Sequence, residues 1–319
     1  MKAIVQERYG SPDGLALREV ETPVYGDDDV LVRVHAASVN AADWHLMKRL
    51  PHLIGKLVGV PWSRVRGHDL AGQVEAVGKN VTRFKPGDEV FGSGVGSFAE
   101  YAKSSERRLA SKPRNVTYEQ AATFAVAGLT ALQGLREKGG LKPGQRVLVY
   151  GAGGGVGTFA VQVAKALGAR VTAVTSTKNV ELLRNLGADE VIDYTKEDFT
   201  RRPERYDILF DLGADRSFSD CRRVLAPGGT LVLAGAGNRV GPIVWRLLGA
   251  QLRSRILRQR VGSFMAKGNH EDLVLLAGLA EAGRLTPAID RTYPLSRTAE
   301  AIRYVGTRAA RGKVVVKVR

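Results

Sequence analysis

Residues 1 to about 120 place their apolar positions in short alternating or clustered runs that are broken by Gly, Pro and Asp. Short alternating runs bounded by turn residues are typical of β-strands. The predicted strands lie at residues 16–23, 28–39, 70–78, 85–92 and 96–104. The first part of the chain therefore predicts a β-rich, barrel-like region.

The pattern changes near Tyr118. Residues 118–137 have apolar positions at a helical period, and from Gln145 onward apolar strands alternate with helices. The predicted strands are 146–151, 170–176, 190–194, 206–212 and 230–237, and the predicted helices are 156–168, 180–187 and 218–225. This alternation predicts βαβ units around a parallel sheet.

The last part of the chain returns to the first pattern. A helical run at 271–283 is followed by a mixed segment at 288–305 and an apolar strand at 312–318. We therefore expect an α/β protein with a doubly wound parallel sheet. Residues 1–120 and 265–319 are expected to form one discontinuous β-rich domain, and residues 121–264 an inserted Rossmann domain.

Composition narrows the class of protein. The 319 residues are 44% apolar and 25% charged, which is typical of a globular chain of two domains. The single cysteine, Cys221, excludes a disulfide within the chain and a four-cysteine zinc site. The first residues contain no apolar signal-peptide core, and no segment has the roughly 18 to 20 apolar residues needed to span a bilayer. We expect a cytoplasmic protein that is not integral to a membrane.

The formal net charge of +16 raises the question of nucleic-acid binding. The basic residues are mostly scattered, and no helix-turn-helix, zinc-finger or RNP-type aromatic pattern accompanies them. This favours a solvated basic surface, which also attracts anionic cofactors, over a nucleic-acid site.

A glycine cluster follows the predicted strand at 147–150 and opens a helix from about Val156. Its residues are Ala152, Gly154, Gly155, Val156 and Gly157, with Ala152 in the first glycine position of the dinucleotide-binding spacing. Glycines let the backbone approach a pyrophosphate, whose charge is stabilised at the helix N-terminus. The strand before the cluster and the helix and second strand after it favour a dinucleotide site over a structural turn.

The end of the second strand bears on the choice of cofactor. An NAD site has Asp or Glu about twenty residues after the loop, where it binds the ribose 2′-hydroxyl. This chain has Thr175, Ser176, Thr177, Lys178 and Asn179 there. Hydroxyls and an ammonium group suit a 2′-phosphate, so we predict NADPH as the cofactor. The alternative interpretation is that Lys178 is an ordinary solvated lysine.

Several motifs occur in a fixed order over nearly the whole chain: GHDLAGQVEAVG, VTRFKPGDEVFG, AGLTALQGL, GAGGGVGTFAVQVAKALGA, LGADEVIDY and GKVVVKV. In this order they resemble the medium-chain dehydrogenase/reductase superfamily, in its zinc-free quinone oxidoreductase branch. The resemblance implies a GroES-like catalytic domain around a Rossmann domain, and a homodimer formed through the latter. It also implies a set of cofactor contacts: Asn40, Thr130, Val156, Ser176, Lys178, Tyr194 and Gly235. Leu212 is predicted to contact the cofactor as well.

The metal-dependent branch of the same superfamily offers an alternative. The stretch NAADWH resembles its Cys-x-x-Asp motif, but Asn40 stands in place of the thiolate, and GHD has Asp69 in place of the usual Glu. A catalytic zinc needs three protein ligands, and the helix near residues 125–128 has no Cys, Asp or Glu to add one. We therefore predict no metal and a hydrogen-bonding role for His68. Asp43, His45 and Asp69 keep a zinc-dependent alcohol dehydrogenase open as an alternative.

The predicted chemistry is hydride transfer from NADPH to an electron-poor small molecule, a quinone or an α,β-unsaturated carbonyl. Asn40 is predicted to be a catalytic polar group near the nicotinamide, and Thr130 a positioning hydroxyl. The anion of such an acceptor is delocalised, so water or a weak donor can protonate it. Tyr25, His45 and His68 are alternative donors that the sequence does not rank.

Residues 44–62 and 241–260 are apolar and basic and contain no acidic residue. They suit a lid, a dimer contact or an interfacial membrane helix as well as ordinary packing under a solvated face. A catalytically weak NADPH-binding protein that contacts membranes through these segments is therefore a further alternative.

Overall fold

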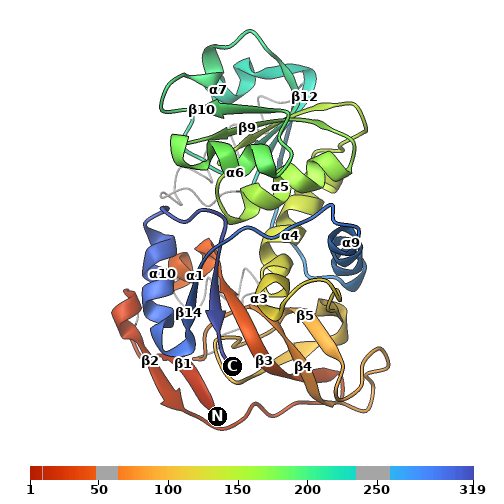
Figure 1. Cartoon of the computed structure of the whole chain (residues 1–319), viewed down its shortest axis with the longest axis vertical. Helices are drawn as coiled ribbons and strands as arrows, with labels where there is room; N and C mark the ends of the chain where they lie inside the picture. The colour runs from red at the N-terminus through yellow and green to blue at the C-terminus, as the bar shows by residue number, and fades with distance from the viewer. Residues whose placement is uncertain (9, 48–63, 235–258) are drawn as a thin grey trace. The chain divides into compact units, whose positions relative to one another are not determined.

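The computed structural model describes residues 1–8, 10–47, 64–234 and 259–319. Gly235 and most of the two basic apolar segments lie outside these residues. The chain forms two compact units (Figure 1). Unit 1 comprises Met1–Ala127, Gly268–Gly283 and Pro287–Arg319, and unit 2 comprises Gly128–Lys267 and Arg284–Thr286.

Unit 1 is rich in β-structure. Its strands are β1 (Lys2–Gln6), β2 (Leu15–Glu19), β3 (Asp29–Val39), β4 (Asp69–Val77), β5 (Glu89–Ser93), β6 (Tyr101–Ser105), β7 (Leu109–Ser111), β14 (Ile289–Pro294) and β15 (Lys313–Lys317). Within the described residues, β1 and β2 form one sheet, and the other seven strands form a second in the order β14-β15-β3-β4-β5-β7 with β6 added to β3. The five strands predicted before residue 120 are present. The strand predicted at 96–104 begins only at Tyr101, because the residues before it bond to β1 instead: the Ile4 amide donates to the Phe98 carbonyl, and Ala99 forms an isolated bridge with Ala3.

The register of three strands brings distant parts of unit 1 together. Ser38 of β3 pairs with Asp69 of β4, and Val39 of β3 pairs with Val314 of β15. The strands hold this register because Val30, Val32 and Val34 of β3 are fully buried in the core of the unit. The residues at these strand ends therefore lie side by side.

Short helices complete unit 1. They are η1 (Pro12–Gly14), α1 (Ala41–Met47), η2 (Glu106–Arg108), α3 (Tyr118–Ala121), α9 (His270–Glu281), η6 (Leu295–Arg297) and α10 (Thr298–Gly306). Helix α4 (Phe124–Gln133) begins in unit 1 and continues into unit 2. The single helix predicted at 118–137 is therefore interrupted after Ala121. At the interruption the Thr123 hydroxyl donates to the Gln120 carbonyl at 2.7 Å, a local bond that competes with the helical pattern.

Unit 2 is a parallel α/β unit. Its strands are β8 (Arg146–Tyr150), β9 (Arg170–Thr175), β10 (Glu190–Asp193), β11 (Tyr206–Asp211), β12 (Leu225–Leu233) and β13 (Arg260–Ser263). Its helices are η3 (Gly134–Lys138), α5 (Gly155–Ala166), η4 (Thr177–Asn179), α6 (Val180–Asn185), η5 (Phe199–Arg201) and α7 (Phe218–Arg223).

The six described strands of unit 2 lie in the order β10-β9-β8-β11-β12-β13, and every neighbouring pair is parallel. Counted from β8, this is the order 3-2-1-4-5-6 of the doubly wound dinucleotide-binding fold. Apolar side chains that include Leu148, Leu209 and Leu231 form the buried core of the sheet. The predicted α/β fold class is confirmed.

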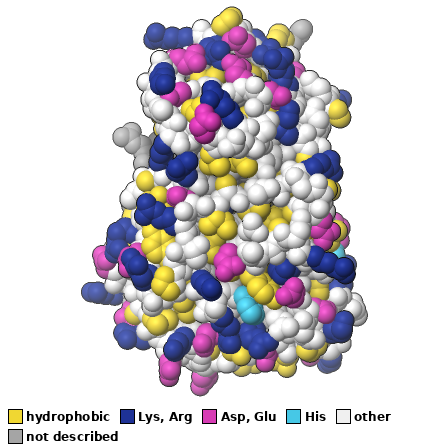
Figure 2. All heavy atoms as spheres, viewed as in Figure 1, with side chains coloured by type: hydrophobic (Ala, Val, Ile, Leu, Met, Phe, Trp, Pro, Cys, Tyr) yellow, Lys and Arg dark blue, Asp and Glu magenta, His cyan; other side chains and the backbone are white. Residues whose placement is uncertain are grey.

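Charged side chains of both signs are interspersed on the face of the protein drawn in Figure 2. Charges of opposite sign also pair within unit 2, where Arg202 Nη1 lies 2.5 Å from Glu190 Oε1 and Arg202 Nε lies 3.5 Å from Glu197 Oε2. Among the described residues, no helix is both long and apolar enough to cross a membrane.

Candidate active site and cofactor loop

The glycine loop of unit 2 connects β8 to α5. Gly151 has a left-handed φ of 84°, and the amides of Gly151 and Ala152 donate to the Val174 carbonyl of β9 at 3.2 and 3.1 Å. Helix α5 begins at Gly155, and its N-cap residue, Gly154, has no side chain to bond the first amides. The N-terminus of this twelve-residue helix therefore offers backbone donors and a positive dipole end to an anion.

The glycines of the loop differ in what surrounds them. A Cβ on Gly157 would lie 2.4 Å from the Gly151 carbonyl oxygen, and one on Gly153 would lie 2.2 Å from Nδ2 of Asn179. A Cβ on Gly154 would meet nothing nearer than 3.6 Å, and the φ of Gly154 is −86°. The fold thus needs glycine at 153 and 157, whereas at Gly154 it leaves room beside the helix N-terminus. This arrangement fits a bound pyrophosphate.

The residues after β9 form a short turn, η4. Thr175 is buried, Ser176 is half-buried, and Lys178 is exposed. Asn179 is buried, and its Nδ2 donates to Oγ1 of Thr175 at 3.2 Å. No acidic residue lies within this turn, as the sequence indicates, so its polar groups are hydroxyls, an amide and an ammonium group.

The other predicted cofactor contacts of unit 2 lie at separate places on the same unit. Tyr194 follows β10 directly and is 45% exposed. Leu212 follows β11, and its amide donates to the Tyr150 carbonyl at the end of β8. Thr130 is half-buried on α4. Gly235 lies outside the described residues.

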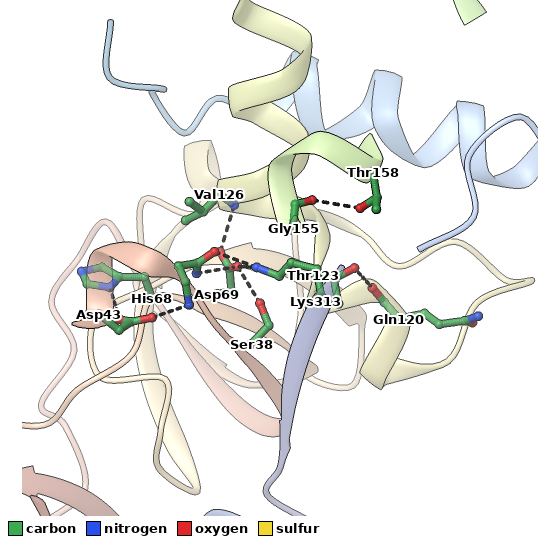
Figure 3. Close-up of polar contacts among 11 residues, drawn as sticks. Ser38, Asp43, His68, Asp69, Gln120, Thr123, Val126, Gly155, Thr158 and Lys313 are labelled. Carbon is green, nitrogen blue, oxygen red and sulfur yellow. Dashed lines mark hydrogen bonds and ion pairs between the residues drawn. The ribbon is translucent and has the colours of Figure 1, made fainter. Parts of the chain in front are cut away.

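In unit 1, Asn40 belongs to a buried polar cluster at the ends of β3, β4 and β15. Figure 3 labels three other members of this cluster, Ser38, Asp69 and Lys313. Lys313 Nζ donates to Oδ1 of Asn40 at 2.6 Å, and Asn40 Nδ2 donates to Oδ2 of Asp69 at 2.9 Å. The ammonium group also lies 3.3 Å from Asp69, and the two charged side chains are 2% and 0% exposed. The amide of Asn40 is therefore held in one orientation by a cation on its oxygen and an anion on its nitrogen.

Further donors complete the coordination of Asp69. The Ser38 hydroxyl donates to Oδ2 at 2.7 Å, and the backbone amide of Val126 donates to Oδ1 at 2.9 Å. Burying a charge is costly unless it is paired and hydrogen-bonded, and Asp69 meets both conditions.

His68 and Asp43 form a second pair beside this cluster (Figure 3). Nδ1 of His68 lies 3.3 Å from Oδ1 of Asp43, whose other oxygen accepts the backbone amide of Asn40 at 2.7 Å. Burial lowers the pKa of His68, but the hydrogen bond and charge of Asp43, with the charge of Asp69, outweigh it and raise the pKa above the usual value. The two residues line a small pocket with Met47, Arg66 and Ile302.

The donors of unit 1 do not suit a catalytic zinc. Asn40 supplies a neutral amide that already bonds Lys313, and Asp69 already accepts four hydrogen bonds, one of them from the Lys313 ammonium. Among the described residues, no three His, Cys, Asp or Glu side chains are grouped so that they could hold a metal ion. A divalent cation would also face the buried ammonium group, which repels it.

Two charged residues of these regions were not recognised from the sequence. The sequence indicates only that Lys313 belongs to the final apolar strand at 312–318 and that Asp193 belongs to the strand predicted at 190–194. The only sequence signal for the buried role of Lys313 is that a single Lys stands at the start of an apolar strand. The carboxylate of Asp193 lies next to the Ser176–Asn179 turn. Because Asp193 is on a different strand, the sequence does not indicate this proximity.

Comparison with known proteins agrees with this geometry. Residues 26–114 match the family model "Alcohol dehydrogenase GroES-like domain", and residues 186–316 match the model "Zinc-binding dehydrogenase". The chain belongs to the medium-chain dehydrogenase/reductase superfamily and, within it, to the quinone oxidoreductase branch. The resemblance stated from the motifs is therefore confirmed, and with it a nicotinamide cofactor.

Individual relatives align over nearly the whole chain. The "2-methylene-furan-3-one reductase" of Solanum lycopersicum is 36% identical over 331 residues, covering 99% of this chain and 79% of the relative. The "NADPH-dependent alkenal/one oxidoreductase, chloroplastic" of Arabidopsis thaliana is 36% identical over 332 residues, with the same coverage. The solved structure of the quinone oxidoreductase from Coxiella burnetii is 32% identical with a TM-score of 0.88, covering 100% of this chain and 99% of that one.

Proposed function

We propose that this protein is a zinc-independent, NADPH-dependent reductase of quinones or α,β-unsaturated carbonyls. Relatives named as reductases of enones, alkenals and quinones align over nearly the whole chain, which supports this substrate class. The observation that carries the proposal is the unit 2 loop, where an uncapped helix N-terminus is followed by a turn with hydroxyl and ammonium groups and no acid.

The residues that would hold the cofactor lie mainly in unit 2. The backbone of Ala152, Gly154, Gly155, Val156 and Gly157 would bind the pyrophosphate at the N-terminus of α5. Ser176, Lys178 and Tyr194 would bind the 2′-phosphate, and Thr175 would support the turn. Leu212, Gly235, Thr130 and Asn40 complete the proposed contacts. The bound cofactor supplies a hydride to the acceptor.

Asn40 is proposed to act through its fixed amide. Lys313 and Asp69 hold the two ends of that amide, so the second hydrogen of Nδ2 keeps one direction and needs no reorganisation during the reaction. His68 is the proposed proton donor among the three alternatives from the sequence. Asp43 holds its Nδ1, and the raised pKa increases the protonated fraction near neutral pH.

The substrate class is tested with a panel of quinones, enones and simple alcohols, with NADPH depletion as the readout. We expect turnover of quinones or enones. Tight NADPH binding without turnover of any acceptor would contradict the proposal and favour the catalytically weak NADPH-binding protein.

Assembly and location are further parts of the proposal. We propose a homodimer in the cytoplasm without nucleic-acid binding, with contact to a membrane surface as the weaker alternative. Light scattering of the purified protein tests the dimer, and cell fractionation tests the location. Flotation with anionic vesicles would detect the membrane contact.

A further inference from the structure

A carboxylate does lie beside the end of β9, but it belongs to the neighbouring strand. Asp193 is the last residue of β10 and the register partner of Thr175, the last residue of β9. Its side chain is buried. It therefore lies one strand away from the position at which an NAD site has its acidic ribose ligand.

Both oxygens of Asp193 are already bonded to protein donors. Oγ1 of Thr177 donates to Oδ2 at 2.6 Å, while the amide and hydroxyl of Thr195 donate to Oδ1 at 3.0 and 2.7 Å. These bonds, above all the one from Thr177, lower the pKa of Asp193 and keep it ionised. The carboxylate of Asp193 therefore holds the turn in place through these bonds, which leaves it less available to accept a hydrogen bond from a ligand.

The turn after β9 is anchored at alternate residues. Thr177 is tied to Asp193 on β10, and Asn179 is tied to Thr175 and packs into the space that Gly153 leaves. Ser176 and Lys178 alternate with these anchored residues along the chain. They are the residues proposed to bind the 2′-phosphate.

We propose that Asp193 and Thr177 are positioning residues that determine cofactor specificity; this inference rests on the proposed use of NADPH. The tether holds Ser176 and Lys178 in place before the cofactor arrives, so less conformational entropy is lost on binding. It also occupies the carboxylate. An unoccupied Oδ2 would accept a hydrogen bond from the ribose 2′-hydroxyl of NADH and would repel a 2′-phosphate.

Thr177→Val tests the tether, because valine keeps the shape of threonine and removes the hydroxyl. We expect the ratio of NADPH to NADH affinity, measured by calorimetry with each cofactor, to fall about tenfold, as the loss of one charge-assisted hydrogen bond would cause. Thr177→Ser keeps the hydroxyl and should retain the wild-type ratio. Thermal unfolding of each variant verifies that it is folded.

A matched variant separates the tether from other effects. Thr200→Val removes a hydroxyl that donates to Asp198 at 2.9 Å on a different turn. It should stay within about twofold of the wild-type ratio. Thr195→Val cannot serve as this control, because the Thr195 hydroxyl lies 3.0 Å from that of Thr177. The inference is overturned if Thr177→Val keeps that ratio, or if Thr200→Val lowers it as much. A wild type that prefers NADH would instead refute the proposed cofactor and, with it, the inference.

Discussion

Ser176 and Lys178 are the side chains on which the proposed preference for NADPH depends. Their joint replacement, Ser176→Ala with Lys178→Ala, should weaken NADPH binding and leave NADH binding nearly unchanged, because only NADPH has a 2′-phosphate for them to bind. Loss of one such contact costs about 1 to 3 kcal/mol, or about tenfold or more in affinity. Dissociation constants for both cofactors provide the measurement. An equal loss for both would contradict the assignment.

Gly154 differs from its neighbours because the fold itself has room for a side chain there. Gly154→Val should therefore fold and yet fail to bind either cofactor, since a branched side chain would fill the space beside the helix N-terminus. Calorimetry and thermal unfolding test the two halves of this prediction. Gly157→Ala is the contrasting variant, because its Cβ would lie 2.4 Å from a backbone oxygen and should destabilise the fold. If the folded Gly154→Val variant bound NADPH with normal affinity, the loop would be a structural turn that does not bind the cofactor.

At the scale of elements, one buried ion pair, Lys313 with Asp69, joins the starts of β15 and β4, and hydrogen bonds from Ser38 and Asn40 attach the end of β3 to it. Lys313→Met would leave Asp69 buried without a countercharge, and we expect a loss of about 3 to 5 kcal/mol in the free energy of unfolding. Adding Asp69→Asn should recover much of that loss, because it removes the unpaired charge. Denaturant unfolding measures both.

The exposed pair of Lys79 and Asp27 provides a control for the buried one. Their Nζ to Oδ2 distance is 2.9 Å, but the side chains are 74% and 58% exposed. Lys79→Met should change stability by less than about 1 kcal/mol, because water screens such pairs. A similar small effect for Lys313→Met would show that the buried pair does not stabilise these strand ends.

At the scale of the whole molecule, metal dependence distinguishes the proposed zinc-independent reductase from the alternative, a zinc-dependent alcohol dehydrogenase. We expect protein purified without added metal to contain substoichiometric zinc, to keep its NADPH-dependent activity after prolonged chelation, and to oxidise simple alcohols poorly. The physical reason is that a metal is what lowers the pKa of an alcohol enough for its oxidation near neutral pH. Metal analysis and activity before and after chelation test this. Near-stoichiometric zinc with turnover that chelation abolishes and zinc restores would favour the alcohol dehydrogenase.

The sequence by itself determined the features that depend on local physics. Alternating apolar residues specify strands, a strand followed by a glycine cluster and a helix specifies the dinucleotide loop, and the order of motifs specifies the superfamily. The absence of an acidic residue after β9 could also be recognised from the sequence, because that position follows the glycine loop at a known spacing and lies next to it in the fold. These signals each span a few residues, so no knowledge of distant contacts is needed to recognise them.

Only the tertiary structure decided which charges meet. Lys313 and Asn40 are 273 positions apart in the chain, and sheet register alone brings them within 2.6 Å. Asp193 is likewise joined to Thr177 by the pairing of β10 with β9, which turns a potential ribose ligand into an anchor. A hydrogen bond between side chains on different strands leaves no periodic trace in the sequence. Its existence depends on register and burial, which are properties of the folded chain.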